Sequence, residues 1–169
     1  IGSFAGSFNG TIINSVSSAD VYGKGSVGGL VGIKGQSMGL CEVKNSRFDG
    51  TVNATGNYIG GIIGEGYSVS SAPNTPGVTI ENCEVSGNIT GANYVGGIFG
   101  GESTQKQAWD TCYIRNNYFN GKVKADEGAY IGGIIGYMNS INRYNIIENN
   151  RYLASCGATE GIGGILFVD

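Results

Sequence analysis

The chain has 169 residues, ten lysines and arginines in total, a formal net charge of −3 and no histidine. Basic residues that are few and scattered exclude a nucleic-acid-binding face. The lack of histidine removes serine–histidine and cysteine–histidine nucleophile pairs, most zinc sites and the usual general base at neutral pH. No apolar run approaches the roughly 20 residues of a membrane-spanning helix. We therefore expect no catalytic residues, no metal, no cofactor, no nucleic-acid partner and no membrane span in this chain.

A short glycine phrase, apolar-Gly-Gly-apolar-apolar-Gly, is the most regular feature of the sequence. It occupies residues 27–32, 59–64, 95–100 and 131–136, with a degenerate copy at 1–6 and a last copy starting at Ile162. Successive copies begin 26 to 36 residues apart, which indicates an array of structural repeats. Glycine at these positions allows a tight bend or a positive φ. The paired glycines predicted to have this structural role are Gly28, Gly29, Gly60, Gly61, Gly96, Gly97, Gly132 and Gly133.

A second element precedes each later glycine phrase and has an asparagine near its start. Its clearest copies are residues 43–52, 80–89 and 114–123, with weaker ones beginning at Ile12 and Ile147. Apolar residues two before, three after and seven after the asparagine are expected to form inward-facing columns. Asparagine tolerates left-handed backbone and can form stacked amide ladders. We expect one column at a corner of the fold, made of Asn14, Asn45, Asn82, Asn116 and Asn149.

Both halves of the repeat, together with abundant β-branched and aromatic residues, predict a single all-β domain over residues 1–169. The expected architecture is a right-handed parallel β-helix, or β-solenoid, of about five coils with three strands in each coil. The residues directly before four of the asparagines alternate in the sign of their charge. They are Lys44, Glu81, Arg115 and Glu148, and this order favours stacking in sequence order. Propeller blades are longer than these repeats, and a leucine-rich horseshoe would need more leucine.

The four cysteines are expected to be free and mostly buried. Cys41 and Cys112 share a phase but lie two repeats apart, about 9.6 Å for stacked strands. That separation exceeds the roughly 7 Å limit for a disulfide. Cys83 and Cys156 have other phases.

Candidate binding residues are aromatic. Tyr58, Tyr94 and Tyr130 each come just before a glycine phrase and form either a packing ladder or a sugar-stacking surface. Trp109, the only tryptophan, is either an exposed contact residue or a loop anchor. Two acidic candidates have simpler interpretations. Arg115 lies between Glu81 and Glu148, which favours ion pairs over an acid–base pair. Residues 126–127 fit a solvated turn better than a calcium site.

The glycine phrase at residues 27–32 and its copies, with the asparagine element, resemble the GLUG motif. That motif recurs in bacterial surface proteins, in adhesin-like proteins of gut bacteria and in the non-catalytic region of immunoglobulin A peptidases from Gram-positive cocci. The resemblance implies a secreted or cell-surface, non-enzymatic stalk or adhesin that contacts a host glycan or surface protein. The last copy departs from the motif because Phe167 replaces its final glycine.

Both ends of the chain fall within a glycine phrase, so we expect a fragment of a longer protein with further repeats or domains. Two alternatives remain open. The chain could be a carbohydrate-active β-helix enzyme, since that fold hosts such enzymes, or an accessory region of a surface peptidase whose active site lies elsewhere on the parent chain.

Overall fold

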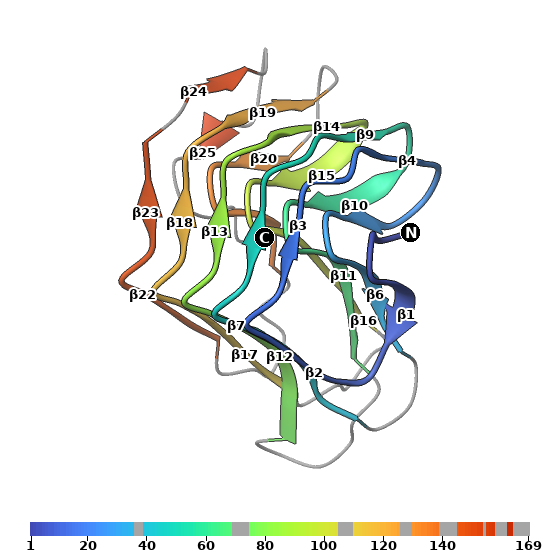
Figure 1. Ribbon diagram of the computed structural model, residues 1–169, viewed down its shortest axis with the longest axis vertical. Coiled ribbons are helices and arrows are strands. Elements are labelled where there is room, and N and C mark those ends of the chain that lie inside the picture. Colours follow the sequence, from blue (N-terminus) through green and yellow to red (C-terminus); the bar gives the residue numbers. More distant parts are fainter. Residues whose placement is uncertain are drawn as a thin grey trace.

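The computed structural model describes residues 1–35, 39–68, 75–104, 110–125, 130–138, 145–153, 155–157 and 162–163. Its regular elements in these ranges are all β-strands. They form five parallel sheets of five strands each, which confirms the all-β parallel solenoid (Figure 1). We name each sheet after its first strand in the chain.

Each sheet contains every fifth strand along the chain, and its strands stack in chain order. The β1 sheet comprises β1 (Ala5–Phe8), β6 (Val31–Lys34), β11 (Ile63–Ser68), β16 (Phe99–Thr104) and β21 (Ile135–Tyr137). The β2 sheet comprises β2 (Gly10–Ile13), β7 (Cys41–Lys44), β12 (Thr75–Glu81), β17 (Asp110–Arg115) and β22 (Ile146–Glu148). The β3 sheet comprises β3 (Val16–Ser17), β8 (Arg47–Phe48), β13 (Glu84–Val85), β18 (Tyr118–Phe119) and β23 (Arg151–Tyr152). The β4 sheet comprises β4 (Val21–Gly23), β9 (Val52–Ala54), β14 (Asn88–Gly91), β19 (Lys122–Ala125) and β24 (Ser155–Gly157). The β5 sheet comprises β5 (Val27–Gly28), β10 (Asn57–Gly60), β15 (Asn93–Gly96), β20 (Ile131–Gly132) and β25 (Ile162–Gly163).

One pass from β2 to β6 is a coil, and each later coil repeats it on top of the one before. In Figure 1 the strands of the β3 sheet lie side by side, from blue β3 to red β23. The register joins equivalent residues: Val43 pairs with Ile80, and Ile80 pairs with Ile114. The predicted stacking in sequence order is therefore confirmed.

The core includes the apolar columns that the asparagine element predicts. Val43, Ile80 and Ile114 are fully buried, while Ile12 and Ile147 in the two terminal coils are partly buried. Two further buried columns run beside this one: Phe48, Val85 and Phe119, and Val52, Ile89 and Val123. Burying such side chains contributes roughly 1.5–3 kcal/mol each, and a column secures that gain at every coil.

The number of strands per coil differs from the prediction of three, because a complete coil has five. The asparagine element is divided among three strands, for instance the end of β7, β8 and the start of β9, and its first break lies at Asn45. The glycine phrase is broken in two after its first glycine, for instance between β10 and β11. Both repeated elements are therefore corners of the solenoid rather than straight strands.

In the part of the chain that the structure describes, no helix has the length and apolar character needed to cross a membrane.

Candidate functional site

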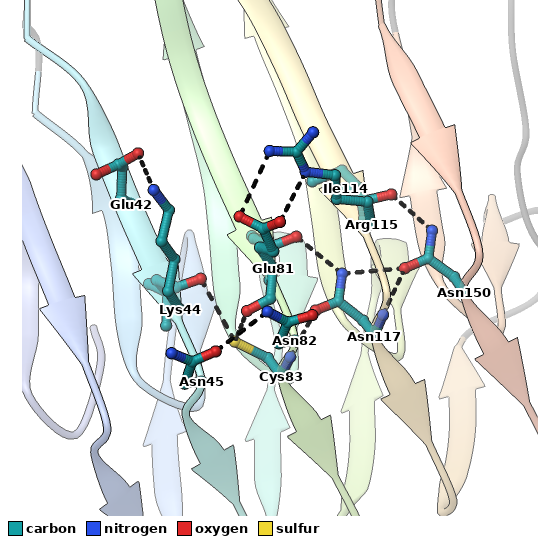
Figure 2. A network of polar contacts seen from close by, with 12 residues as sticks. Glu42, Lys44, Asn45, Glu81, Asn82, Cys83, Ile114, Arg115, Asn117 and Asn150 are labelled. Carbon is teal, nitrogen blue, oxygen red and sulfur yellow. Dashed lines mark hydrogen bonds and ion pairs between the residues drawn. The ribbon is translucent and has the colours of Figure 1, made fainter.

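The corner asparagines all have left-handed backbone. Their φ angles lie between 49° and 57° at Asn14, Asn45, Asn82, Asn116 and Asn149. Asparagine adopts this conformation more readily than most residues, and it redirects the chain from the β2 sheet to the β3 sheet. The side chain of Asn82 donates a hydrogen bond of 3.1 Å to Oδ1 of Asn45, so the predicted amide column has a rung there (Figure 2).

The residue after each corner asparagine belongs to a second column, which points inward and was not predicted. We call Ser15, Ser46, Cys83, Asn117 and Asn150 the inner polar column. Ser46, Cys83 and Asn117 are at most 3% exposed. Figure 2 shows Cys83, Asn117 and Asn150 on successive coils, each reaching toward the coil before it.

Asn117 shows what this column does. Its Oδ1 accepts the backbone N–H of Cys83 at 2.9 Å, and its Nδ2 donates to the carbonyl of Ile80 at 2.9 Å. Asn150 repeats both contacts one coil later, to the N–H of Asn117 at 3.0 Å and the carbonyl of Ile114 at 2.6 Å. Each side chain thus satisfies two backbone groups that the left-handed corner turns away from the sheet ladder.

The paired glycines form the other repeated corner, where two parts of the backbone approach closely. A Cβ on Gly60 would overlap the carbonyl oxygen of Ile63 within the same turn. A Cβ on Gly61 would overlap the carbonyl oxygen of Gly97 in the next coil and lie 2.8 Å from Cγ1 of Val85. The need for glycine is therefore steric. The positive φ at this corner belongs instead to the preceding tyrosines, at 58° for Tyr58 and 49° for Tyr94.

The outer charges pair both along and between strands. Nε of Arg115 lies 3.0 Å from Oε1 of Glu81 in the neighbouring coil, as the alternating signs suggest. Lys44, by contrast, pairs with Glu42 on its own strand at 2.7 Å. The hydrogen bond from Lys44 is the largest cause of the lowered pKa of Glu42. The register places Arg115 between Glu81 and Glu148, as the repeat alignment predicts.

Three cysteines are free and buried, as predicted: Cys41, Cys83 and Cys112. The register places Val78 between Cys41 and Cys112, so these two lie two coils apart. Burial raises the pKa of Cys41 to about 12 and that of Cys83 to about 11. Both are therefore thiols at neutral pH and poor nucleophiles. The side chain of Cys156 lies outside the described residues.

The tyrosine column is stacked. Ring centroids are 4.7 Å apart for Tyr58 and Tyr94, and 5.5 Å apart for Tyr94 and Tyr130. Tyr137, from the β1 sheet, lies against Tyr94 at 4.8 Å. These contacts favour the packing-ladder interpretation, because neighbouring rings cover the two faces of Tyr94.

A nearly buried carboxylate lies beside this column. Glu65 is 9% exposed, and its two oxygens accept hydrogen bonds from the hydroxyls of Ser26 and Ser103 on the neighbouring coils. Burial raises the pKa of Tyr58 to about 12, and the charge of Glu65 adds to the shift. The sequence pattern did not single out Glu65, although it directly follows a glycine phrase.

Two opposite charges are buried in one column of the β1 sheet, and the sequence pattern missed both. Lys34 and Glu102 are at most 2% exposed, and the register places Gly66 between them. The ammonium group of Lys34 donates to the carbonyl of Tyr67 at 3.1 Å, and the thiol of Cys112 donates to Glu102 at 2.9 Å. A Cβ on Gly66 would lie 2.9 Å from Cζ of Phe99, 3.0 Å from Cγ2 of Val78 and 3.3 Å from Cγ of Glu102, so these side chains fill the space that the glycine leaves.

The remaining candidates from the sequence are a tryptophan and an acidic pair. Trp109 and residues 126–127 lie outside the described residues. Within the described ranges, no three histidine, cysteine, aspartate or glutamate side chains gather closely enough to hold a metal ion.

The fold and these corners define the class of protein: a parallel β-solenoid whose repeated polar side chains bind one coil to the next. No protein-family model, curated protein or solved structure matches the chain.

Proposed function

We propose that this chain is a non-enzymatic repeat module of a secreted or cell-surface protein, acting as a stalk or adhesin. The strongest support for this proposal is that polar side chains of the chain form hydrogen bonds to neighbouring coils. The inner polar column binds backbone groups of neighbouring coils, and Glu65 is bonded to serines on both sides. Groups committed in this way hold a scaffold together, which is what a stalk or a display surface requires.

The tyrosine column is our candidate contact face for a host glycan or surface protein. Tyr58 and Tyr94 keep left-handed backbone, which is unfavourable for bulky residues and concentrates at functional sites. Their rings are partly exposed but stacked, so a ligand would contact ring edges and hydroxyls.

A glycan panel and a panel of host surface proteins test the adhesin role. The wild-type chain is compared with Tyr94→Gly, which retains the positive φ, and with Tyr113→Ala, which removes an aromatic ring from a different sheet. We expect Tyr94→Gly to lose binding and Tyr113→Ala to retain it. Equal binding by all three chains would rule out this face, and no binding by the wild-type chain would leave the stalk role alone.

The same panel distinguishes a scaffold from an enzyme. We expect no released reducing ends and no cleaved peptides after prolonged incubation. Turnover by the wild-type chain would overturn the non-enzymatic assignment and favour the carbohydrate-active alternative. Antibody labelling of intact producing cells tests the location, with labelling expected before permeabilisation.

A further inference from the structure

Four tyrosine rings lie together in one group, which we call the phenol cluster. Tyr58 lies in β10 and Tyr94 in β15, Tyr130 directly precedes β20, and Tyr137 ends β21. All four side chains are partly exposed. Tyr94 contacts each of the other three, with ring centroids 4.7 to 5.5 Å apart. The cluster therefore brings several phenols into contact where solvent reaches them.

The backbone fixes the closest pair in the cluster, Tyr58 and Tyr94, in equivalent positions on neighbouring strands. The register pairs the residue before Tyr58 with the residue before Tyr94, and does the same for the residues after them. Both tyrosines have left-handed backbone, with φ of 58° and 49°, so both side chains leave the strand in the same way. Their ring centroids are 4.7 Å apart and their planes are inclined by 26°. A reaction between two groups held in contact does not have to wait for a collision between molecules.

Neighbouring phenols can be joined by oxidation. Loss of one electron and one proton turns each phenol into a phenoxyl radical, whose unpaired electron is shared between the oxygen and the ortho and para carbons of the ring. The para carbon carries the rest of the side chain, so two such radicals couple through ortho carbons. One C–C bond forms, the two ortho hydrogens leave as protons, and the two oxygens regain theirs. With a haem peroxidase as catalyst, one hydrogen peroxide takes up the two electrons and two protons and becomes two water molecules.

We propose that Tyr58 and Tyr94 form an oxidative cross-linking site, at which hydrogen peroxide and a haem peroxidase join two coils through a dityrosine bond. The bond links the coil of β10 to the coil of β15, across positions that are 36 residues apart. Closing such a loop removes conformations from the unfolded chain, as a disulfide does. The described cysteines supply no such bond, because Cys41, Cys83 and Cys112 are free. This inference holds whether or not the tyrosine column binds a ligand.

Three tyrosines outside the cluster lack this arrangement. Tyr113 lies beneath the guanidinium group of Arg115, 5.4 Å from its ring centroid, and Tyr118 lies 5.9 Å from that of Arg151. Tyr22 is 65% exposed. Within the described residues, no aromatic ring stacks on any of these three tyrosines. Tyr22 therefore combines access to an oxidant with no described partner, which makes it the matched control.

Oxidation of dilute protein tests the reaction. The wild-type chain, Tyr94→Phe and the control Tyr22→Phe are treated with a haem peroxidase and hydrogen peroxide at neutral pH, and the monomer is isolated. Phenylalanine retains the ring but has no phenol to oxidise. We expect dityrosine fluorescence in the wild-type and Tyr22→Phe monomers, and at least threefold less in Tyr94→Phe. Equal fluorescence from the wild-type chain and Tyr94→Phe, or cross-links found only in covalent dimers, would overturn the proposal.

Peptide mapping of the oxidised wild-type monomer identifies the partners and needs no variant. Cleavage after glutamate places Tyr58 in residues 43–65 and Tyr94 in residues 85–102, while the other two rings of the cluster share residues 128–148. We expect the first two peptides to be joined, with a combined mass lower by two hydrogens than the sum of the separate peptides. A monomer without this peptide pair, or one in which residues 85–102 are joined only to residues 128–148, would contradict the assignment.

Urea unfolding tests whether the bond holds the two coils together. We expect the midpoint of the cross-linked wild-type monomer to lie above that of the untreated chain, because the bond constrains the unfolded state. The Tyr94→Phe monomer, treated in the same way, controls for oxidation elsewhere and should not gain stability. An equal rise in both chains, or no rise in the cross-linked one, would show that the bond does not link the coils as proposed.

Discussion

The two repeated corners of each coil solve the same bending problem in different ways. At the asparagine corner the bend uses left-handed backbone, and the inner polar column satisfies the groups that the bend exposes. At the glycine corner the bend brings backbone against backbone, and the missing side chains provide the space. One corner depends on polar groups that must be present, and the other on atoms that must be absent.

This difference has an energetic consequence. A lost hydrogen bond can be partly replaced by water near the surface, whereas an added carbon atom in a close-packed corner has nowhere to go. We therefore expect the glycine corner to tolerate less change than the asparagine corner. Four measurements test that ranking, beginning with the largest expected effect.

The largest effect should come from Gly61→Ala. The new Cβ would overlap the carbonyl oxygen of Gly97 and lie 2.8 Å from Cγ1 of Val85, so two coils would have to separate. We expect the free energy of unfolding in urea to fall by about 4 kcal/mol or more. Gly6→Ala is the matched control, because a Cβ there meets nothing within 4 Å and should change stability by less than about 1 kcal/mol. Similar losses for both would refute the steric explanation.

Asn117→Leu should have the next largest effect, because it removes the polar groups at similar volume. The N–H of Cys83 and the carbonyl of Ile80 would both lose a buried partner. We expect a loss of about 3 kcal/mol in the same urea experiment. Asn120→Leu, at an exposed position in the same coil, should stay within about 0.5 kcal/mol of the wild-type chain. A neutral Asn117→Leu would mean that water satisfies the corner.

Two substitutions at Asn82 separate its backbone from its side chain. Asn82→Ala keeps a Cβ in left-handed backbone at φ 53° and also removes the rung to Asn45, so we expect a loss of about 1–2 kcal/mol. Asn82→Gly removes only the exposed rung, and we expect a loss of a few tenths of a kcal/mol. Equal losses would show that the amide ladder, and not the backbone, selects asparagine.

The smallest effect at neutral pH concerns the thiol of Cys83. Its pKa is about 11 in the folded chain against an ordinary value of 9.0, because burial disfavours the thiolate. Above pH 9 the unfolded chain releases this proton and the folded chain retains it, so stability should fall as the pH rises from 9 toward 11. Cys83→Ser keeps a donor and does not titrate in this range. Its urea midpoint should fall less steeply with pH than that of the wild-type chain, and parallel curves would contradict the assignment.

The repeat allowed much of the fold to be predicted, because each copy could be compared with the others. Its phases correctly identified the buried columns, the left-handed asparagines and the separation of Cys41 from Cys112. The tyrosine stack also followed from phase alone. These features depend only on which residues are equivalent, and parallel stacking then brings equivalent residues together.

The features that escaped prediction depend on the path of the backbone within a coil. Side chains alternate along a strand, but a left-handed residue breaks the alternation, so Asn117 turns inward directly after the exposed Asn116. A consistent run of serine, cysteine and asparagine after the corner was the available signal. Lys34 and Glu102 gave no such signal, because each is the only residue of its type in its column.

The buried column of Lys34, Gly66 and Glu102 has a consequence for how the chain avoids misassembly. Coils that look alike could in principle pair out of order while the protein folds. Exchanging two coils would leave an ammonium or a carboxylate among hydrocarbon side chains. We expect these three residues to distinguish their three coils from one another, so that this nearly periodic sequence folds with one order of coils.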